Sequence, residues 1–245
     1  MVKASLHASG RELVQRPATL LEKPKARLAV DLDQLIALLI LRKPDLFFVQ
    51  IGAFDGQTGD QLHPWIARYD WSGILVEPQP RYFAALKHTY ADRPKLQLRD
   101  VAIAEVPEER TLYTIREGVP GLPHWAPQVA SFDRARLQSR GWRGRDGEDV
   151  IEAVQVQCLP LPHLLDEVKQ VDLLQIDVEG YDAEIIRMFD FDRFRPAIVR
   201  FESRHLSRGQ LDAAVRRLVS YGYRVAVGYR DTLAWHDEAS SANGA

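Results

Sequence analysis

Two carboxylates follow an apolar segment in the second half of the sequence. The run 172–176 reads Asp-Leu-Leu-Gln-Ile, and Asp177, Glu179 and Gly180 come after it. Acids spaced in this way can act as a general base, hold a metal ion or contact a cation. Acids also stabilise the positive end of a following helix, so a purely structural role is the alternative interpretation.

A second group of polar residues follows the apolar segment 197–201. Glu202 comes first, and His205 lies three residues further on. Histidine titrates near neutral pH, which suits a general base. Glu202 and His205 therefore join Asp177 as candidate catalytic residues, although an exposed histidine is more often incidental.

A glycine-bearing turn and a distant acid indicate a site for a nucleoside. Gly52, Gly56 and Gly59 follow the apolar segment 47–51 at spacings of four and three residues, which is not the G-x-G-x-x-G pattern of dinucleotide dehydrogenases. Glycine lets the backbone approach a ligand closely. Glu77 lies 25 residues after Gly52, where an acid can accept hydrogen bonds from ribose hydroxyls. An ordinary tight turn and a solvated acid are the alternative.

These residues come together only if the apolar segments form one sheet. Apolar runs alternate with stretches of helical periodicity, which predicts a parallel sheet with helices on both faces, a Rossmann-like doubly wound α/β fold. Ligands of such sheets bind at the carboxyl ends of the strands. Ser207 and Gln210 form a capping box that marks the last helix. The predicted strands are 47–51, 73–77, 96–103, 111–115, 153–157, 172–177 and 197–202, with a closing pair at 223–227 and 232–235.

One domain with an irregular insertion is predicted. Residues 116–150 are rich in turn-forming and aromatic residues, and such an insertion is typical of a lid over an active site. We expect an N-terminal extension at 1–28, a single domain at 29–237 that begins with an amphipathic helix at 32–41, and a flexible tail at 238–245.

The composition argues against several classes of protein. The 245 residues are 46% hydrophobic and 27% charged, as in soluble globular proteins rather than disordered or polytopic membrane proteins. Lys and Arg number 32 against 34 for Asp and Glu, so no nucleic-acid partner is expected. The single cysteine, Cys158, excludes a disulfide framework and favours a cytoplasmic location. No targeting signal is predicted, and segment 32–41 is shorter than the ~20 residues of a transmembrane helix.

Four motifs resemble those of the FkbM-type methyltransferases. They are FVQIGAFDG at 48–56, LVEP at 75–78, VDLLQIDVEGY at 171–181 and FE at 201–202, and the resemblance spans roughly residues 45–235. Members are class I enzymes that use S-adenosylmethionine. The resemblance implies a seven-stranded sheet with an antiparallel last strand, and methyl transfer to a hydroxyl of a sugar, glycolipid or natural product.

The resemblance also implies which residues hold the cofactor. Glu77 would bind the ribose, and Asp100 with Val101 would contact the adenine. Phe54 departs from the family, which usually has asparagine there. The full set of expected cofactor-binding residues is Gln50, Gly52, Ala53, Asp55, Gly56, Glu77, Pro78, Asp100 and Val101.

On the acceptor side, Asp177 or His205 would take the proton of the hydroxyl, with Glu202 beside them. In a second version Asp177, Glu179 and Glu202 share a Mg²⁺ ion that lowers the pKa of the hydroxyl. Trp125 and Trp142, both in the insertion, would cover a small-molecule or glycan acceptor.

Other functions remain open at this point. A nicotinamide-dependent oxidoreductase would use a similar sheet, but the missing G-x-G-x-x-G counts against it. A non-catalytic module that binds a nucleoside is a second alternative, which the Phe54 departure leaves open. Nucleic-acid methylation is a weaker third, given the balanced charge.

Overall fold

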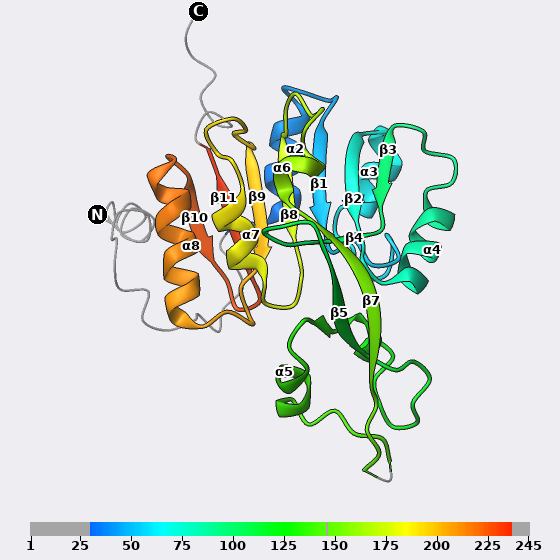
Figure 1. The fold of residues 1–245 in the computed structure, drawn as a ribbon. Helices are drawn as coiled ribbons and strands as arrows, with labels where there is room; N and C mark the ends of the chain where they lie inside the picture. The colour runs from blue at the N-terminus through cyan, green and yellow to red at the C-terminus, as the bar shows by residue number, and fades with distance from the viewer. Residues whose placement is uncertain (1–29, 146, 237–245) are drawn as a thin grey trace, which may run out of the picture.

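The computed structural model describes residues 30–145 and 147–236, which form two sheets (Figure 1). The larger is seven-stranded, with the order β10-β11-β9-β8-β1-β2-β3, and β11 runs antiparallel to both of its neighbours. The predicted doubly wound sheet with a reversed last strand is therefore confirmed. Its strands are β1 (Phe47–Ile51), β2 (Ser72–Val76), β3 (Leu96–Arg99), β8 (Leu173–Ile176), β9 (Ile198–Glu202), β10 (Arg224–Val227) and β11 (Asp231–Trp235).

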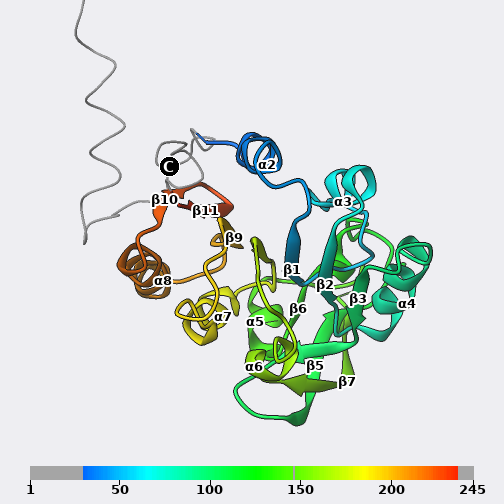
Figure 2. The ribbon, with the colours of Figure 1, turned by 90° about the horizontal axis from the view of Figure 1, so that it is seen from above.

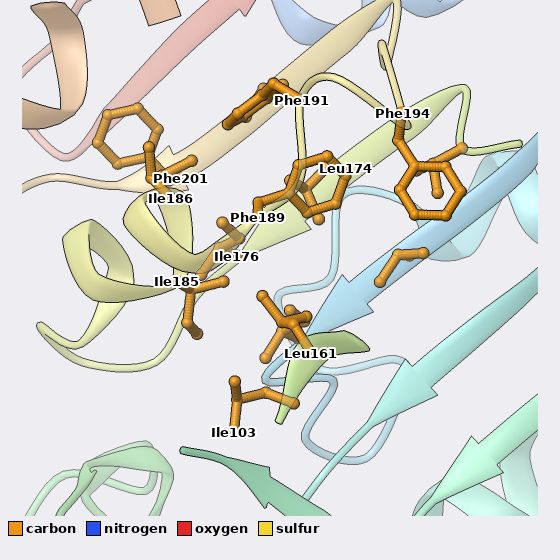
Figure 3. Close-up of a cluster of buried hydrophobic side chains, with 14 of the residues drawn as sticks. Ile103, Leu161, Leu174, Ile176, Ile185, Ile186, Phe189, Phe191, Phe194 and Phe201 are labelled. Carbon is orange, nitrogen blue, oxygen red and sulfur yellow. The ribbon is translucent and has the colours of Figure 1, made fainter. Parts of the chain in front are cut away.

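Helices cover both faces of this sheet (Figure 2). Along β1, Phe48 packs with the helices of one face and Val49 with those of the other, because successive side chains of a strand point to opposite faces. Figure 3 shows the hydrophobic cluster on the Val49 face of the sheet, in which Phe189, Phe191 and Phe194 pack together. On the Phe48 face lie α2 (Leu32–Ile40), α3 (His63–Tyr69) and α4 (Pro80–Thr89), and on the other α6 (Leu161–Leu164), α7 (Asp182–Met188) and α8 (Arg208–Ser220).

The predicted strand 96–103 is two strands that belong to different sheets. β3 ends at Arg99, and β4 (Val101–Ile103) begins after Asp100. β3 alternates between half-buried and exposed residues, as an edge strand does, whereas every residue of β4 is buried. The chain turns away at Asp100 because β4 is buried by pairing with β7 rather than by continuing along the edge.

A second, four-stranded sheet was not predicted from the sequence. β5 (Glu108–Ile115) and β7 (Ile151–Leu159) form a long antiparallel pair, with β4 and β6 (Ala130–Ser131) on its sides. Figure 1 shows this pair as an arm that extends beyond the larger sheet. The strand expected at 111–115 is the C-terminal part of β5, and the one expected at 153–157 is the middle of β7.

The insertion at 116–150 lies at the far end of this arm (Figure 1). It contains the 3₁₀ helix η1 (Ala126–Gln128), β6 and α5 (Arg134–Ser139). Val119, Val129 and Leu137 are buried together in its own small core, so the segment is a folded unit. Its role as a lid stays a prediction.

The remaining expectations concern the ends of the chain. The helix expected at 32–41 is α2, and within the described residues no helix is long and apolar enough to cross a membrane. The proposed extension at 1–28 and the tail at 238–245 lie outside the described residues.

Candidate functional site

Two adjoining cavities open at the carboxyl edge of the larger sheet, where ligands of such sheets bind. Cavity I, of about 210 Å³, is lined by residues such as Val101, Ile103 and Phe132. Cavity II, of about 860 Å³, is lined by acids, arginines, two histidines and two tryptophans. Both cavities share Gly52, Glu77, Gln128, Asp177 and Glu179. A ligand that occupies both would therefore pass over the ends of β1, β2 and β8.

Gly52 closes the first turn against the end of β8. Its φ is +85°, and a Cβ atom there would lie 1.9 Å from the carbonyl oxygen of Asp177. Only glycine permits this approach. The glycine was expected to allow close contact with a ligand, but its close contact is with the backbone of Asp177.

Glu77 is buried between the two cavities, with its orientation fixed by the backbone. Its Oε1 accepts from the Gln79 N–H and its Oε2 from the Phe54 N–H, both at 2.9 Å. Burial raises the pKa of Glu77 to about 7, against the lowering effect of these bonds. Each carboxylate oxygen retains a lone pair that can accept from a hydroxyl group.

The other expected cofactor residues divide into two groups. Gln50 and Ala53 line cavity II, and Pro78 and Val101 line cavity I. The remaining three lie outside both linings: Asp55, Gly56 and Asp100.

These three have structural surroundings of their own. Asp55 accepts from Gln57 N and Thr58 N, at 2.9 and 2.7 Å, and so builds the turn. Gly56 is buried against Tyr90, whose hydroxyl donates to its carbonyl oxygen at 2.9 Å. Asp100 is exposed at the break between β3 and β4.

Phe54 occupies a backbone conformation that asparagine tolerates better. Its φ is +51°, in the left-handed region. The Phe54 ring lies against Tyr82 at 4.0 Å between centroids. The asparagine that the resemblance implies at this position would suit this backbone conformation better than Phe54 does.

The candidate catalytic residues do come together at cavity II. His205 Nε2 lies 3.1 Å from Glu179 Oε2 and 3.6 Å from Glu202 Oε2. Arg140, at the end of α5, contacts the same Glu179 oxygen at 3.0 Å. Burial would raise the pKa of Glu179, but His205 and Arg140 outweigh it and lower that pKa. Burial, followed by the charge of Asp177, raises the pKa of Glu202 well above its usual value.

Asp182 connects the two loops that carry these residues. It is fully buried, and its carboxylate accepts from Gly180 N at 3.0 Å and from Glu202 N at 3.2 Å. The turn after β8 is thereby tied to the end of β9. Asp182 was not predicted from the sequence, although aspartate side chains commonly bond to nearby backbone N–H groups in turns.

Asp177 pairs with a buried arginine. Arg200 Nη1 lies 3.9 Å from Asp177 Oδ2, and Arg200 Nη2 donates to Asp231 at 2.9 Å. Burial raises the pKa of Asp177, and Arg200 acts against this increase. Arg200 and Gln175 were missed, yet both are polar residues inside apolar strands. Their registers place Gln50, Gln175 and Arg200 side by side across β1, β8 and β9.

The grouping of potential metal ligands differs from the expected one. Among the described residues, Glu179, Glu202 and His205 bring one ligand atom each within 4.8 Å of one another, whereas the sequence suggested Asp177, Glu179 and Glu202. Mg²⁺ prefers an all-oxygen set. Arg140 already neutralises Glu179, so the arrangement favours a hydrogen-bonded cluster over a magnesium site.

Several buried polar atoms of residues that line cavity II have no hydrogen-bond partner in the described part of the chain. Such atoms are costly unless a ligand or water satisfies them. They belong to residues that line the cavity, and they include both acceptors and an indole donor. The atoms are Gln50 Oε1, Asp60 Oδ2, Trp142 Nε1, Gln175 Oε1 and Glu202 Oε2.

Fold and site together define an α/β protein with a doubly wound sheet and a ligand site at its carboxyl edge. The chain belongs to the FkbM methyltransferase family, because a model of the methyltransferase FkbM domain matches residues 50–225. No curated protein sequence matches significantly.

Two solved structures that are similar to the chain carry methyltransferase names. Methyltransferase FkbM from Methylobacillus flagellatus KT is 13% identical, with a TM-score of 0.49 over 79% of this chain and 44% of that one. Precorrin-6y C5,15-methyltransferase from Geobacter metallireducens GS-15 is 15% identical, with a TM-score of 0.44 over 88% and 92%. The chain thus spans less than half the length of the first structure. At these identities the likeness concerns the fold alone.

Proposed function

We propose that the protein transfers a methyl group from S-adenosylmethionine to a hydroxyl group of a sugar, glycolipid or natural product. The supporting observation is the pair of adjoining cavities that share Gly52, Glu77 and Asp177. In this proposal cavity I holds the nucleoside and cavity II holds the methionine end together with the acceptor.

The residues present fit S-adenosylmethionine. Val101 and Ile103 offer apolar contacts to an adenine, and the buried Glu77 carboxylate can accept from ribose hydroxyls. Gln50 and Asp60 offer unpartnered oxygens to the methionine ammonium. When bound, the cofactor supplies an electrophilic methyl group on its sulfonium.

His205 is our preferred general base. An ionised Glu179 accepts the Nε2 proton at 3.1 Å, which leaves Nδ1 of the neutral ring to take the hydroxyl proton. Glu179 then stabilises the imidazolium that forms. Asp177, which lines both cavities, is the alternative base. Loss of the base typically lowers kcat about 10²–10⁴-fold, so comparing His205→Gln with Asp177→Asn distinguishes the two.

Magnesium-assisted transfer is the competing version. If Glu179 and Glu202 held Mg²⁺, EDTA would abolish turnover and added Mg²⁺ would restore it. Turnover that EDTA leaves unchanged eliminates this version.

An alcohol suits the polar groups of cavity II. The unpartnered Trp142 indole N–H is a donor, and the Glu202 carboxyl group lies in the same cavity. A hydroxyl group can accept from the first and pair with the second. Trp125 also lines this cavity, and its ring meets that of Trp142 edge-on at 5.5 Å. Such aromatic surfaces suit the apolar faces of sugar rings.

Calorimetric titration with S-adenosylhomocysteine tests the proposal first. We expect micromolar binding, about −8 kcal/mol, that weakens sharply in Glu77→Ala. Absence of binding to the wild type would overturn the methyltransferase proposal. Binding without turnover on any alcohol would favour the non-catalytic module, and tight NADH binding would favour the oxidoreductase.

A further inference from the structure

Two arginines stand together at the rim of cavity II. Arg204 follows β9, and Arg230 lies in the turn between β10 and β11. Both line the cavity and both are exposed. The cofactor and proton-transfer roles proposed above do not use either residue.

The backbone holds these two arginines next to each other. Ser203 N and Arg204 N donate to the carbonyl oxygen of Arg230 at 2.8 and 2.9 Å. Beneath them the buried Thr232 hydroxyl donates to Ser203 Oγ at 2.9 Å. The loop after β9 and the β10–β11 turn are therefore joined, so the two arginines occupy adjacent backbone positions at cavity II.

Other arginines already serve the acids of this cavity. Arg200 contacts Asp231 and Asp177, and Arg140 contacts Glu179. Arg230 forms no ion pair with any residue in the described ranges. The positive charge of Arg230 does act on Asp177: it lowers the pKa of Asp177, although burial raises that pKa by more. Both arginines carry a positive charge into the lining of cavity II, and such charges attract an anionic ligand.

The cavity thus has two chemically different regions. One is the acid–histidine cluster of Glu179, Glu202 and His205, at which a hydroxyl can lose its proton. Arg204 and Arg230 lie at the rim. Guanidinium groups bind carboxylates and phosphates through paired hydrogen bonds, which also fix the orientation of the bound group.

We propose that Arg204 and Arg230 bind an anionic group of the acceptor, a carboxylate or a phosphate, and thereby orient the acceptor hydroxyl toward the acid–histidine cluster. This inference rests on the proposed function, because it assumes that cavity II takes the acceptor. It narrows the substrate class from alcohols in general to alcohols that carry an anion.

Calorimetry on the full chain saturated with S-adenosylhomocysteine tests the inference. The probes are glucuronate, glucose 6-phosphate and the neutral methyl glucoside. We expect at least one anionic probe to bind roughly 10-fold or more tightly than the neutral one. In the double variant Arg204→Gln, Arg230→Gln, the affinity for that anionic probe should fall to the affinity for the neutral methyl glucoside. The stronger of the two anionic probes identifies the carboxylate or the phosphate.

The matched control is Arg216→Gln, which removes an exposed arginine on α8 outside both cavities. It should leave binding of the anionic probes unchanged. Equal binding of all three probes, no measurable binding of either anion, or an equal loss in Arg216→Gln would overturn the inference. If S-adenosylhomocysteine binds and the anions do not, only this inference fails; if S-adenosylhomocysteine does not bind, the proposed function fails. Unchanged S-adenosylhomocysteine affinity in the double variant shows that it is folded.

Discussion

At the scale of single residues, the candidate site depends on groups that are buried and closely packed. Glu77 is 3% exposed and is held by two backbone N–H groups. Gly52 lies so close to the Asp177 backbone, at the end of β8, that a Cβ atom at residue 52 would not fit. Both residues were predicted from the sequence to bind the cofactor, and their contacts show what fixes each of them in its position.

Glu77 predicts a pH dependence of cofactor binding. Its pKa is raised to about 7 by burial, and ribose hydroxyls donate to the ionised carboxylate. Below pH 7 the Glu77 carboxyl group is mostly protonated, so cofactor binding must first remove that proton. We expect S-adenosylhomocysteine affinity to rise about 10-fold per pH unit up to neutrality and then level off. Calorimetry from pH 5.5 to 8.5 checks this, and Glu77→Gln should flatten the profile. A flat wild-type profile would contradict the role of Glu77.

Gly52→Ala should be strongly destabilising. The new Cβ would meet the Asp177 carbonyl oxygen, and φ would stay at +85°, so we expect a loss of about 3 kcal/mol or more in the free energy of unfolding. Gly118→Ala is the matched control. It also has a positive φ, +69°, but nothing lies within 4 Å of the added atom, so only about 1 kcal/mol should be lost. Urea denaturation measures both, and equal losses would refute the steric argument.

At the scale of elements, the insertion is fastened to the sheet by α5. Arg136 donates to the carbonyl oxygen of His205 at 2.8 Å, and Arg140 pairs with Glu179. Gly180 has a φ of +111°, a conformation that favours glycine, and the Arg136 guanidinium lies where a Cβ atom of residue 180 would be. One short helix therefore contacts the turns after both β8 and β9.

Arg136→Ala should loosen the insertion without unfolding the domain. The insertion keeps its own small core, so we expect faster amide hydrogen exchange in 116–145, with exchange in β1 and β8 unchanged. Arg143→Ala, an exposed arginine in the same insertion, is the control and should leave exchange as in the wild type. Unchanged exchange in Arg136→Ala would show that the insertion is held by other contacts.

At the scale of the whole molecule, the carboxyl edge concentrates acids that burial makes hard to ionise. Burial raises the pKa of Glu77 and of Asp182 to about 7 each, from 4.5 and 3.8. Asp177 and Glu202 shift in the same direction. The folded protein therefore holds more protons than the unfolded chain between about pH 4 and neutrality.

This charge distribution predicts greater stability on the acidic side of neutrality. Because the folded state binds more protons in that window, the free energy of unfolding should fall as the pH rises from 5 to 8. Urea denaturation of the ligand-free protein at both values measures the difference. Asp182→Asn should reduce the pH dependence even if it lowers stability overall. A protein that is more stable at pH 8 would contradict the raised pKa values.

The sequence alone determined the strands of the larger sheet, its class and the residues at the strand ends, because apolar periodicity and capping signals are local. Tertiary structure decided the rest. Whether 96–103 is one strand or two depends on what β4 pairs with, and β7 lies some 50 residues further along the chain. The row of Gln50, Gln175 and Arg200 exists only through the register of three strands, and Arg140 reaches Glu179 only because the arm returns α5 to the sheet.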